Sequence, residues 1–305
     1  MTRREPAFLS WPEEVARPRQ RDDPAFAHAG TNLILDFHGD PLNAQLVVFS
    51  DGNHHMALEE SLRAFLARHP DAVDVFYATT PPRVLVEAIA KGHLRVGNLT
   101  LSRAPHVFIG PAPVLDGLVE RGLMTSHARF MQSRGNVLLV RQGNPKSITG
   151  LRDLLRDDVR LALSNPETEA ASYGVYRDTL RGLAAGAGID VGVLDKLLAS
   201  DRVVHSAAIH HREIPQLVAD DRADAAIVYY HLALRYTRVF AGLFEIVKLA
   251  PLVGEPGFTP ANRVTAYHVG RIGEGGPWGA RLLDFMNGDD VASIYRHHGL
   301  QRPTG

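Results

Sequence analysis

The stretch Gln45–Leu66 limits the fold more than any other part of this 305-residue chain. It begins with a short continuous apolar run, Leu46–Phe49, of the kind found in strands buried on both faces of a parallel sheet. A polar turn follows, and apolar residues then recur at helical spacing from His54 onward. The order strand, turn and helix predicts an α/β protein, with Asn53 as the N-cap of the helix.

This turn also predicts a binding site. A helix that starts at the carboxyl edge of a strand offers free backbone N–H groups and the positive end of its dipole. We therefore expect the turn at Asn53 and His54 to bind a small anion. The alternative is that Asn53 only caps the helix and that His54 and His55 are surface residues.

The composition excludes several classes of function. The 33 basic and 34 acidic residues give a net charge of −1 and are mixed along the chain, so nucleic acid and anionic membranes are not expected as partners. The chain has no cysteine, which excludes disulfides and cysteine-based metal sites. We predict no cofactor.

Residues 1–30 are rich in Arg, Pro, Asp and Glu and show no periodicity, which predicts a poorly ordered arm. They lack the apolar segment of about 7–15 residues that a secretory signal requires. No later run reaches the roughly 18–20 apolar residues of a membrane span. As it stands, the sequence predicts a cytoplasmic protein without membrane insertion; a periplasmic location is expected if the start is truncated.

Strand and helix patterns alternate along the rest of the chain, which predicts mostly parallel sheets flanked by helices. Thr79 and Thr80 are expected at the end of the second strand, beside the turn at Asn53. Further strands are predicted at residues 72–77, 99–101, 106–109, 136–141, 159–163, 203–204, 223–229 and 264–269. Helices are predicted at residues 83–91, 113–121, 148–155, 213–219, 278–286 and 289–297, with one more ending near residue 185.

Four segments in this order carry a family resemblance. They are the strand–turn–helix at 47–58, VRLALSNPETEAASYGVY at 159–176, ADAAIVYY at 223–230 and LLDFMNGDDVASIYRHHGL at 282–300. Together they resemble the type II periplasmic solute-binding proteins, most of all the molybdate-binding (ModA-like) branch. The resemblance implies two α/β lobes with a ligand cleft between them. Lobe 1 would contain residues 31–134 plus 260–305, and lobe 2 residues 135–259.

The resemblance also implies a function and a site. It implies hinged capture of a small anion, an oxyanion or small carboxylate, and the membrane component of an ABC transporter as partner; recognition without catalysis is then the whole chemistry. Matching the family motifs residue by residue, and adding the neighbour of Asn53, gives the expected ligand-binding set Asn53, His54, Thr79, Thr80, Ser172, His211 and Tyr229.

The chain departs from the family pattern at two positions, and this leaves alternatives open. Asn53 replaces a serine, and His211 stands where the family supplies mainly backbone, so a larger carboxylate, a phosphonate or a metal suits the site as well. The pair Tyr229–Tyr230 resembles the consecutive tyrosines of ferric-ion-binding members, with His54 and His211 as further metal ligands.

Two other classes of function also stay open. An enzyme on the same fold, similar to aconitate isomerase, would use His54, His55, His210 or His211 as general acid or base. A non-catalytic intracellular sensor is the third hypothesis. The plain structural interpretation of Tyr229 is a core residue at the end of a strand.

Overall fold

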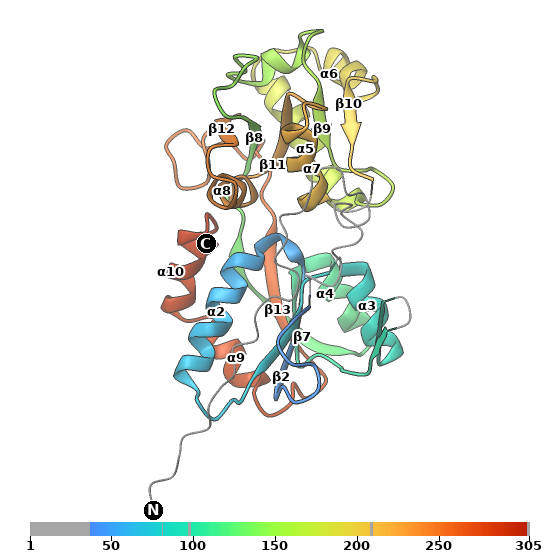
Figure 1. Cartoon of the computed structure of the whole chain (residues 1–305), viewed down its shortest axis with the longest axis vertical. Coiled ribbons are helices and arrows are strands. Elements are labelled where there is room, and N and C mark those ends of the chain that lie inside the picture. The colour runs from blue at the N-terminus through green and yellow to red at the C-terminus, as the bar shows by residue number, and fades with distance from the viewer. Residues whose placement is uncertain (1–36, 81, 97–98, 208–209, 304–305) are drawn as a thin grey trace, which may run out of the picture.

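The computed structural model describes residues 37–80, 82–96, 99–207 and 210–303, and these form two α/β lobes stacked along the long axis (Figure 1). The arm predicted for residues 1–30 lies outside the described residues. The sheet of the first lobe has the order β1 (Phe37–His38), β3 (Val75–Ala78), β2 (Leu46–Ser50), β6 (Val107–Pro111), β13 (Ala266–Ile272) and β7 (Met124–Gln132). The sheet of the second lobe has the order β10 (Val203–His205), β9 (Leu161–Leu163), β11 (Ala225–Tyr229), β8 (Asn136–Arg141) and β12 (Phe244–Lys248).

Each sheet contains a parallel part of three strands. In the first sheet β2 pairs in parallel with β3 and β6, and every residue of β2 is buried. In the second sheet β9 pairs in parallel with β10 and β11. The strands β13 and β8 run against these central strands. The predicted two-lobed α/β fold is thereby confirmed. The sheets are mixed and not mostly parallel, because four of the strand pairings described in the two sheets are parallel and five are antiparallel.

Helices cover both faces of each sheet. In the first lobe one core cluster lies under α2 (His55–Arg68), α9 (Gly279–Met286) and α10 (Asp289–His297). A second cluster lies under α3 (Pro82–Lys91) and α4 (Ala112–Glu120), next to the small hairpin of β4 (Leu94–Val96) and β5 (Leu99–Leu101). The second lobe has one continuous core, formed with η3 (Leu151–Leu155), α5 (Ala170–Gly186), α6 (Val191–Leu198), α7 (His210–Ala219) and α8 (Tyr230–Val239). Across the described ranges, no helix has the length and apolar character needed to cross a membrane.

Most predicted elements are present, and several others were not predicted. Helix α10 has the predicted bounds, and β2 extends the predicted run by one residue. Strand β7 was not predicted because its sequence, MTSHARFMQ, is polar over most of its length. Helices α6 and α8 and strand β12 were also not predicted.

Two adjacent chain segments connect the lobes, one between β7 and β8 and one leading into β13 (Figure 1). They are hydrogen-bonded to each other, since Ser133 N donates to Thr265 O at 2.9 Å and Thr265 N donates to Ser133 Oγ at 2.8 Å. Gly135 in the first segment has φ +118°, and a Cβ atom there would lie 2.7–2.9 Å from the side chain of Asn262. Asn262 Oδ1 accepts a hydrogen bond from Asn136 N at 2.7 Å, which fixes the second segment against the first. The connection is therefore a defined double crossing with a glycine at its tightest point.

Candidate functional site

The turn after β2 forms the lobe 1 side of the candidate site, and Asp51 organises it. Asp51 is 1% exposed and is the N-cap of the short helix η2 (Gly52–His54). Its Oδ1 accepts the N–H of Asn53 at 2.7 Å. The prediction that Asn53 is the N-cap is therefore wrong: the cap lies two residues earlier, at Asp51, which has the extended backbone conformation of an N-cap residue.

Asp51 places an acid where the sequence suggested a vacant anion site. Burial raises the pKa of Asp51 to about 6, and its hydrogen bonds from the backbone and side chain of Asn53 oppose this rise. The carboxylate is thus mostly charged at neutral pH and takes up a proton at a higher pH than an exposed aspartate does. A further anion at this helix start would meet a group of like charge.

Thr79 and Thr80 lie beside this turn, as predicted. Strands β2 and β3 pair in parallel with Phe49 opposite Ala78, so the residues that follow each strand leave the sheet at the same edge. Both threonines are buried, and Thr80 Oγ1 has no hydrogen-bond partner. A buried hydroxyl without a partner is rare because it loses its bonds to water and gains nothing. Thr80 is therefore a candidate ligand contact.

The side chain of His54 is buried in lobe 1. It is 2% exposed, its Nε2 lies 3.0 Å from Ser50 Oγ, and its Nδ1 lies 2.9 Å from Tyr295 OH. Burial lowers the pKa of His54 to about 3, assisted by the nearby His231 and His55. Both ring nitrogens are engaged and the ring is neutral, so His54 has no free nitrogen for a ligand, a metal or proton transfer.

Tyr229 brings lobe 2 to the same place. It ends β11, precedes the first residue of α8 and is 3% exposed. Its hydroxyl lies 2.9 Å from Thr265 Oγ1 in the crossing segment. Burial raises the pKa of Tyr229, and the charge of Asp51 raises it further. The two predicted regions, the turn of lobe 1 and the end of β11 in lobe 2, therefore lie within electrostatic reach of each other.

His231 is a residue that sequence reasoning missed. It is 4% exposed, its ring stacks on that of Tyr229 with 5.3 Å between centroids, and its Nε2 lies 3.4 Å from Tyr267 OH of lobe 1. Burial lowers the pKa of His231 to about 3, and the nearby carbonyl of Asn53 opposes this. His231 lies two residues after Tyr229, in the first turn of α8. A prediction of this helix would have placed His231 beside Tyr229.

The structure does not bring Ser172 into this group. Its hydroxyl donates to the carbonyl of Glu169 at 3.1 Å, within the first turn of α5. The Glu169 carboxylate accepts a hydrogen bond from Ser206 Oγ at 3.0 Å, so lobe 2 also carries an acid at a helix start. His211 lies in the first turn of α7, and its side chain is outside the described residues.

The proposed pair of tyrosine metal ligands does not converge. The hydroxyl of Tyr229 faces Thr265, whereas the ring of Tyr230 lies under the guanidinium of Arg134, 5.5 Å from its centroid. Among the described residues, no group of three or more His, Asp and Glu side chains could hold a metal ion. The geometry therefore gives the two-tyrosine arrangement no support.

Comparisons with known proteins agree with this two-lobed fold. The family model of bacterial extracellular solute-binding proteins matches residues 46–301. No curated protein matches the chain.

Solved structures of low sequence identity share the fold. The sulfate-binding protein SubI from Mycobacterium tuberculosis has a TM-score of 0.62 at 16% identity, covering 85% of this chain and 87% of its own. The periplasmic molybdate-binding protein of Azotobacter vinelandii has a TM-score of 0.59 at 17% identity, covering 85% and 100%. PEB3 of Campylobacter jejuni, in its complex with L-phospholactate, has a TM-score of 0.59 at 15% identity, covering 84% and 99%. At such identities the likeness shows the fold alone.

Proposed function

This chain belongs to the family of bacterial extracellular solute-binding proteins, and we propose that its solute is a small organic acid that carries a hydroxyl group or an acidic proton. The acid is held between the lobes, and hinge motion at the double crossing closes them over it. Delivery to the membrane component of an ABC transporter is part of the same proposal. The solutes named for the similar structures include sulfate, molybdate and L-phospholactate, of which only the last is an organic acid.

The buried carboxylate of Asp51 carries this proposal. A fully ionised oxyanion such as molybdate or sulfate would place two negative charges next to Asp51 with little water between them, which costs several kcal/mol at an interface. An acid with a hydroxyl group donates a hydrogen bond to the carboxylate instead. Asp51 is therefore a selectivity filter against bare divalent anions.

The other polar groups near the turn fit an organic acid as well. Thr80 supplies a buried hydroxyl that still lacks a partner. Tyr229 supplies an uncharged hydroxyl, since its pKa is raised. We assign the contacts with the ligand to Asn53, Thr79, Thr80 and Tyr229. Asp51 selects for a ligand with a protonated or hydroxylated group, and His54 supports the turn.

Thermal melting against matched pairs of acids tests this function. Each pair consists of a small hydroxycarboxylate or phosphorylated hydroxy acid and its analogue without the hydroxyl or acidic proton, at constant ionic strength and pH 7.5. A ligand at about a hundred times its Kd stabilises by roughly 2.7 kcal/mol. We expect at least one hydroxy acid to stabilise the protein and its deoxy analogue to bind about tenfold to a hundredfold more weakly. Stabilisation by molybdate or sulfate, with none by any organic acid, would overturn the proposal.

A further inference from the structure

A cavity of about 630 Å³ lies on lobe 2, between η3, α5 and the segment that leads from β12 toward β13. We call it the α5 groove, and it is lined by Thr149, Gly150, Leu151, Arg152, Asp153, Gly182, Leu183, Gly186, Ala187, Ile189, Leu249, Thr259 and Ala261. Sites for small organic molecules usually have volumes of roughly 300–1,000 Å³. The lining includes no residue of η2, β3 or α8, so the groove is separate from the proposed solute site.

The walls of the α5 groove are largely apolar. Leu151 of η3 and Ile189 after α5 are 7% and 8% exposed, and they form the deepest apolar part. Leu183 of α5 and Leu249 after β12 are half-buried and keep part of their apolar surface in contact with water. A ligand with an apolar body would cover this surface, which is favourable in proportion to the area removed from water.

Two glycines of α5 line the groove, and close packing explains only one of them. A Cβ atom at Gly182 would lie 3.1 Å from Cβ of Ala261, so this glycine lets α5 approach the segment before β13. At Gly186, the last residue of α5, a Cβ atom would have no neighbour within 4 Å, and the backbone does not require a positive φ. Glycine in a helix is less stable than alanine. The open space above Gly186 is therefore not demanded by the packing of lobe 2.

Arg152 is the charged group of the groove that is available to a ligand. Its Nη2 donates to the carbonyl of Ala187 at 2.7 Å, and across the described ranges its guanidinium makes no ion pair. The acid in the lining, Asp153, is already engaged: its Oδ2 accepts the N–H and the hydroxyl of Thr149 at 2.7 and 2.9 Å, and its Oδ1 lies 3.6 Å from Nη1 of Arg156. The groove thus combines an apolar surface with one uncompensated positive charge at its edge.

We propose that the α5 groove binds an amphipathic carboxylate. The carboxylate group pairs with Arg152, whose planar set of N–H donors matches its two oxygens. The aliphatic part lies over Gly186, against Leu183 and Leu249. Because Ala261 also lines the groove, the ligand contacts the segment that leads into the crossing between the lobes. The proposal does not rest on the identity of the solute.

Isothermal titration of the full chain with decanoate, below the concentration at which it forms micelles, tests this site. Two further probes separate the contributions of charge and chain. Acetate has the carboxylate without the chain, and decylammonium has the same chain with the opposite charge. We expect saturable binding of one decanoate, binding of decylammonium at least about tenfold weaker, and no measurable binding of acetate.

Two variants alter the groove, and each has a matched control. Gly186→Leu fills the open space and is expected to weaken decanoate binding at least about tenfold. Its control is Gly117→Leu on α4, where a Cβ atom likewise has no neighbour within 4 Å; decanoate affinity should not change there. Arg152→Gln is expected to weaken binding about tenfold, whereas Arg121→Gln, at an exposed arginine of lobe 1, should bind like the wild type. Thermal melting of each variant checks that it is folded.

Three outcomes overturn the groove proposal. Equal affinities for decanoate and decylammonium would show association with apolar surface and no role for Arg152. Wild-type decanoate affinity in a folded Gly186→Leu protein would show that decanoate binds elsewhere. Loss of decanoate binding in Thr80→Val, with retention in Gly186→Leu and Arg152→Gln, would place decanoate at the solute site. That last result contradicts the groove proposal and leaves the proposed solute function to its own matched pairs of acids.

Discussion

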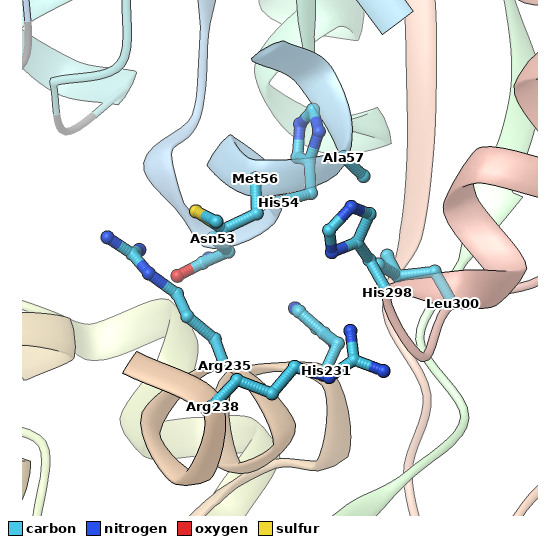
Figure 2. A pocket seen from close by; sticks show the side chains of 9 residues that line it. All are labelled: Asn53, His54, Met56, Ala57, His231, Arg235, Arg238, His298 and Leu300. Atoms are coloured by element: carbon cyan, nitrogen blue, oxygen red, sulfur yellow. The ribbon is translucent and has the colours of Figure 1, made fainter. Parts of the chain in front are cut away.

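The short helix η2 takes part in two polar regions of opposite character. One is acidic and closed: the Asp51 carboxylate is buried at the helix start, beside Thr80 and within electrostatic reach of Tyr229. The other is basic and small: a cavity of about 20 Å³, the seam pocket, has no acid in its lining, which consists of Asn53, His54, Met56, Ala57, His231, Arg235, Arg238, His298 and Leu300 (Figure 2). Both regions lie where the lobes meet, and the fold supplies the same helix to both.

This difference shows that a helix N-terminus between two lobes does not by itself define an anion site. The dipole and free N–H groups of η2 are general features of the fold. In this chain the Asp51 carboxylate caps η2 and accepts the N–H of Asn53. The positive charge comes from elsewhere, from Arg235 and Arg238 of α8. Whether an anion is accepted at such a turn is therefore decided by the side chains around it.

The largest effect is expected from charging the two buried histidines that lie in these regions. His54 and His231 have folded pKa values of about 3, below the value near 6.5 of an unfolded histidine. The unfolded chain therefore binds protons more readily between pH 6.5 and 3, and stability is full above this window and is lost as pH falls through it. Asp51 acts in the opposite sense, because its folded pKa of about 6 exceeds its unfolded value of 3.8.

As the pH falls, the stability lost through the two histidines exceeds the stability gained through Asp51. We therefore expect the free energy of unfolding to fall by roughly 2–4 kcal/mol between pH 7 and pH 4. Urea unfolding at several pH values measures this. In His54→Gln most of the loss should disappear, because Asp51 nearly offsets the one remaining histidine, whereas His93→Gln, outside both regions, should keep the wild-type pH dependence. An unchanged dependence in His54→Gln would show that this ring titrates normally in the folded protein.

Asp51→Asn should abolish the contrast between the two regions. The amide oxygen can still accept the N–H of Asn53, but the charge is gone. We expect sulfate or molybdate to bind about tenfold to a hundredfold more tightly at the solute site, and the hydroxy acid about tenfold more weakly. Isothermal titration of the wild type and of Asp51→Asn with each ligand measures these affinities.

The matched control for Asp51→Asn is Asp190→Asn. Asp190 caps α6 in the same way, with Oδ1 accepting the N–H of Gly192 at 2.8 Å, but it is exposed. Anion affinities should not change in it. Unchanged sulfate and molybdate affinities in Asp51→Asn itself would remove Asp51 from the role of selectivity filter.

The acidic region could be predicted in part from the sequence. The apolar run of β2 and the helical spacing after it fixed the position of the turn, and parallel pairing brought Thr79 and Thr80 to it. Asp51 was missed as the cap because Asp and Asn are both favoured there and only the backbone conformation decides between them. Whether a side chain in this turn is buried depends on lobe 2, which lies far away in sequence.

The basic region could not be predicted. Its residues come from a helix, α8, that sequence reasoning did not predict, because its first residue directly follows the last residue of strand β11 with no turn residue between them. Its other wall comes from η2 and the end of α10, about 180 and 60 residues away along the chain. A pocket made by three segments that are remote in sequence leaves no local pattern in any of them.

A smaller effect is expected from Thr80→Val, which separates binding from stability. The substitution keeps the shape of the side chain and removes a buried hydroxyl without a partner. We expect the protein to become more stable by roughly 1 kcal/mol and to bind its organic acid about tenfold more weakly. Urea unfolding and titration on the same samples measure both. A loss of stability with unchanged binding would show that the hydroxyl serves the fold of lobe 1.

The smallest effect is expected from Ser172→Ala, which tests the limit of residue-by-residue transfer from a family. The sequence placed Ser172 in the ligand-binding set, but its hydroxyl is bonded to the carbonyl of Glu169 in its own helix. Alanine is a better helix former, so the free energy of unfolding should change by less than about 0.5 kcal/mol and the affinity for the organic acid by less than about twofold. A tenfold loss of affinity would mean that this hydroxyl turns to the ligand when the solute binds, and the acidic region would then extend to the start of α5.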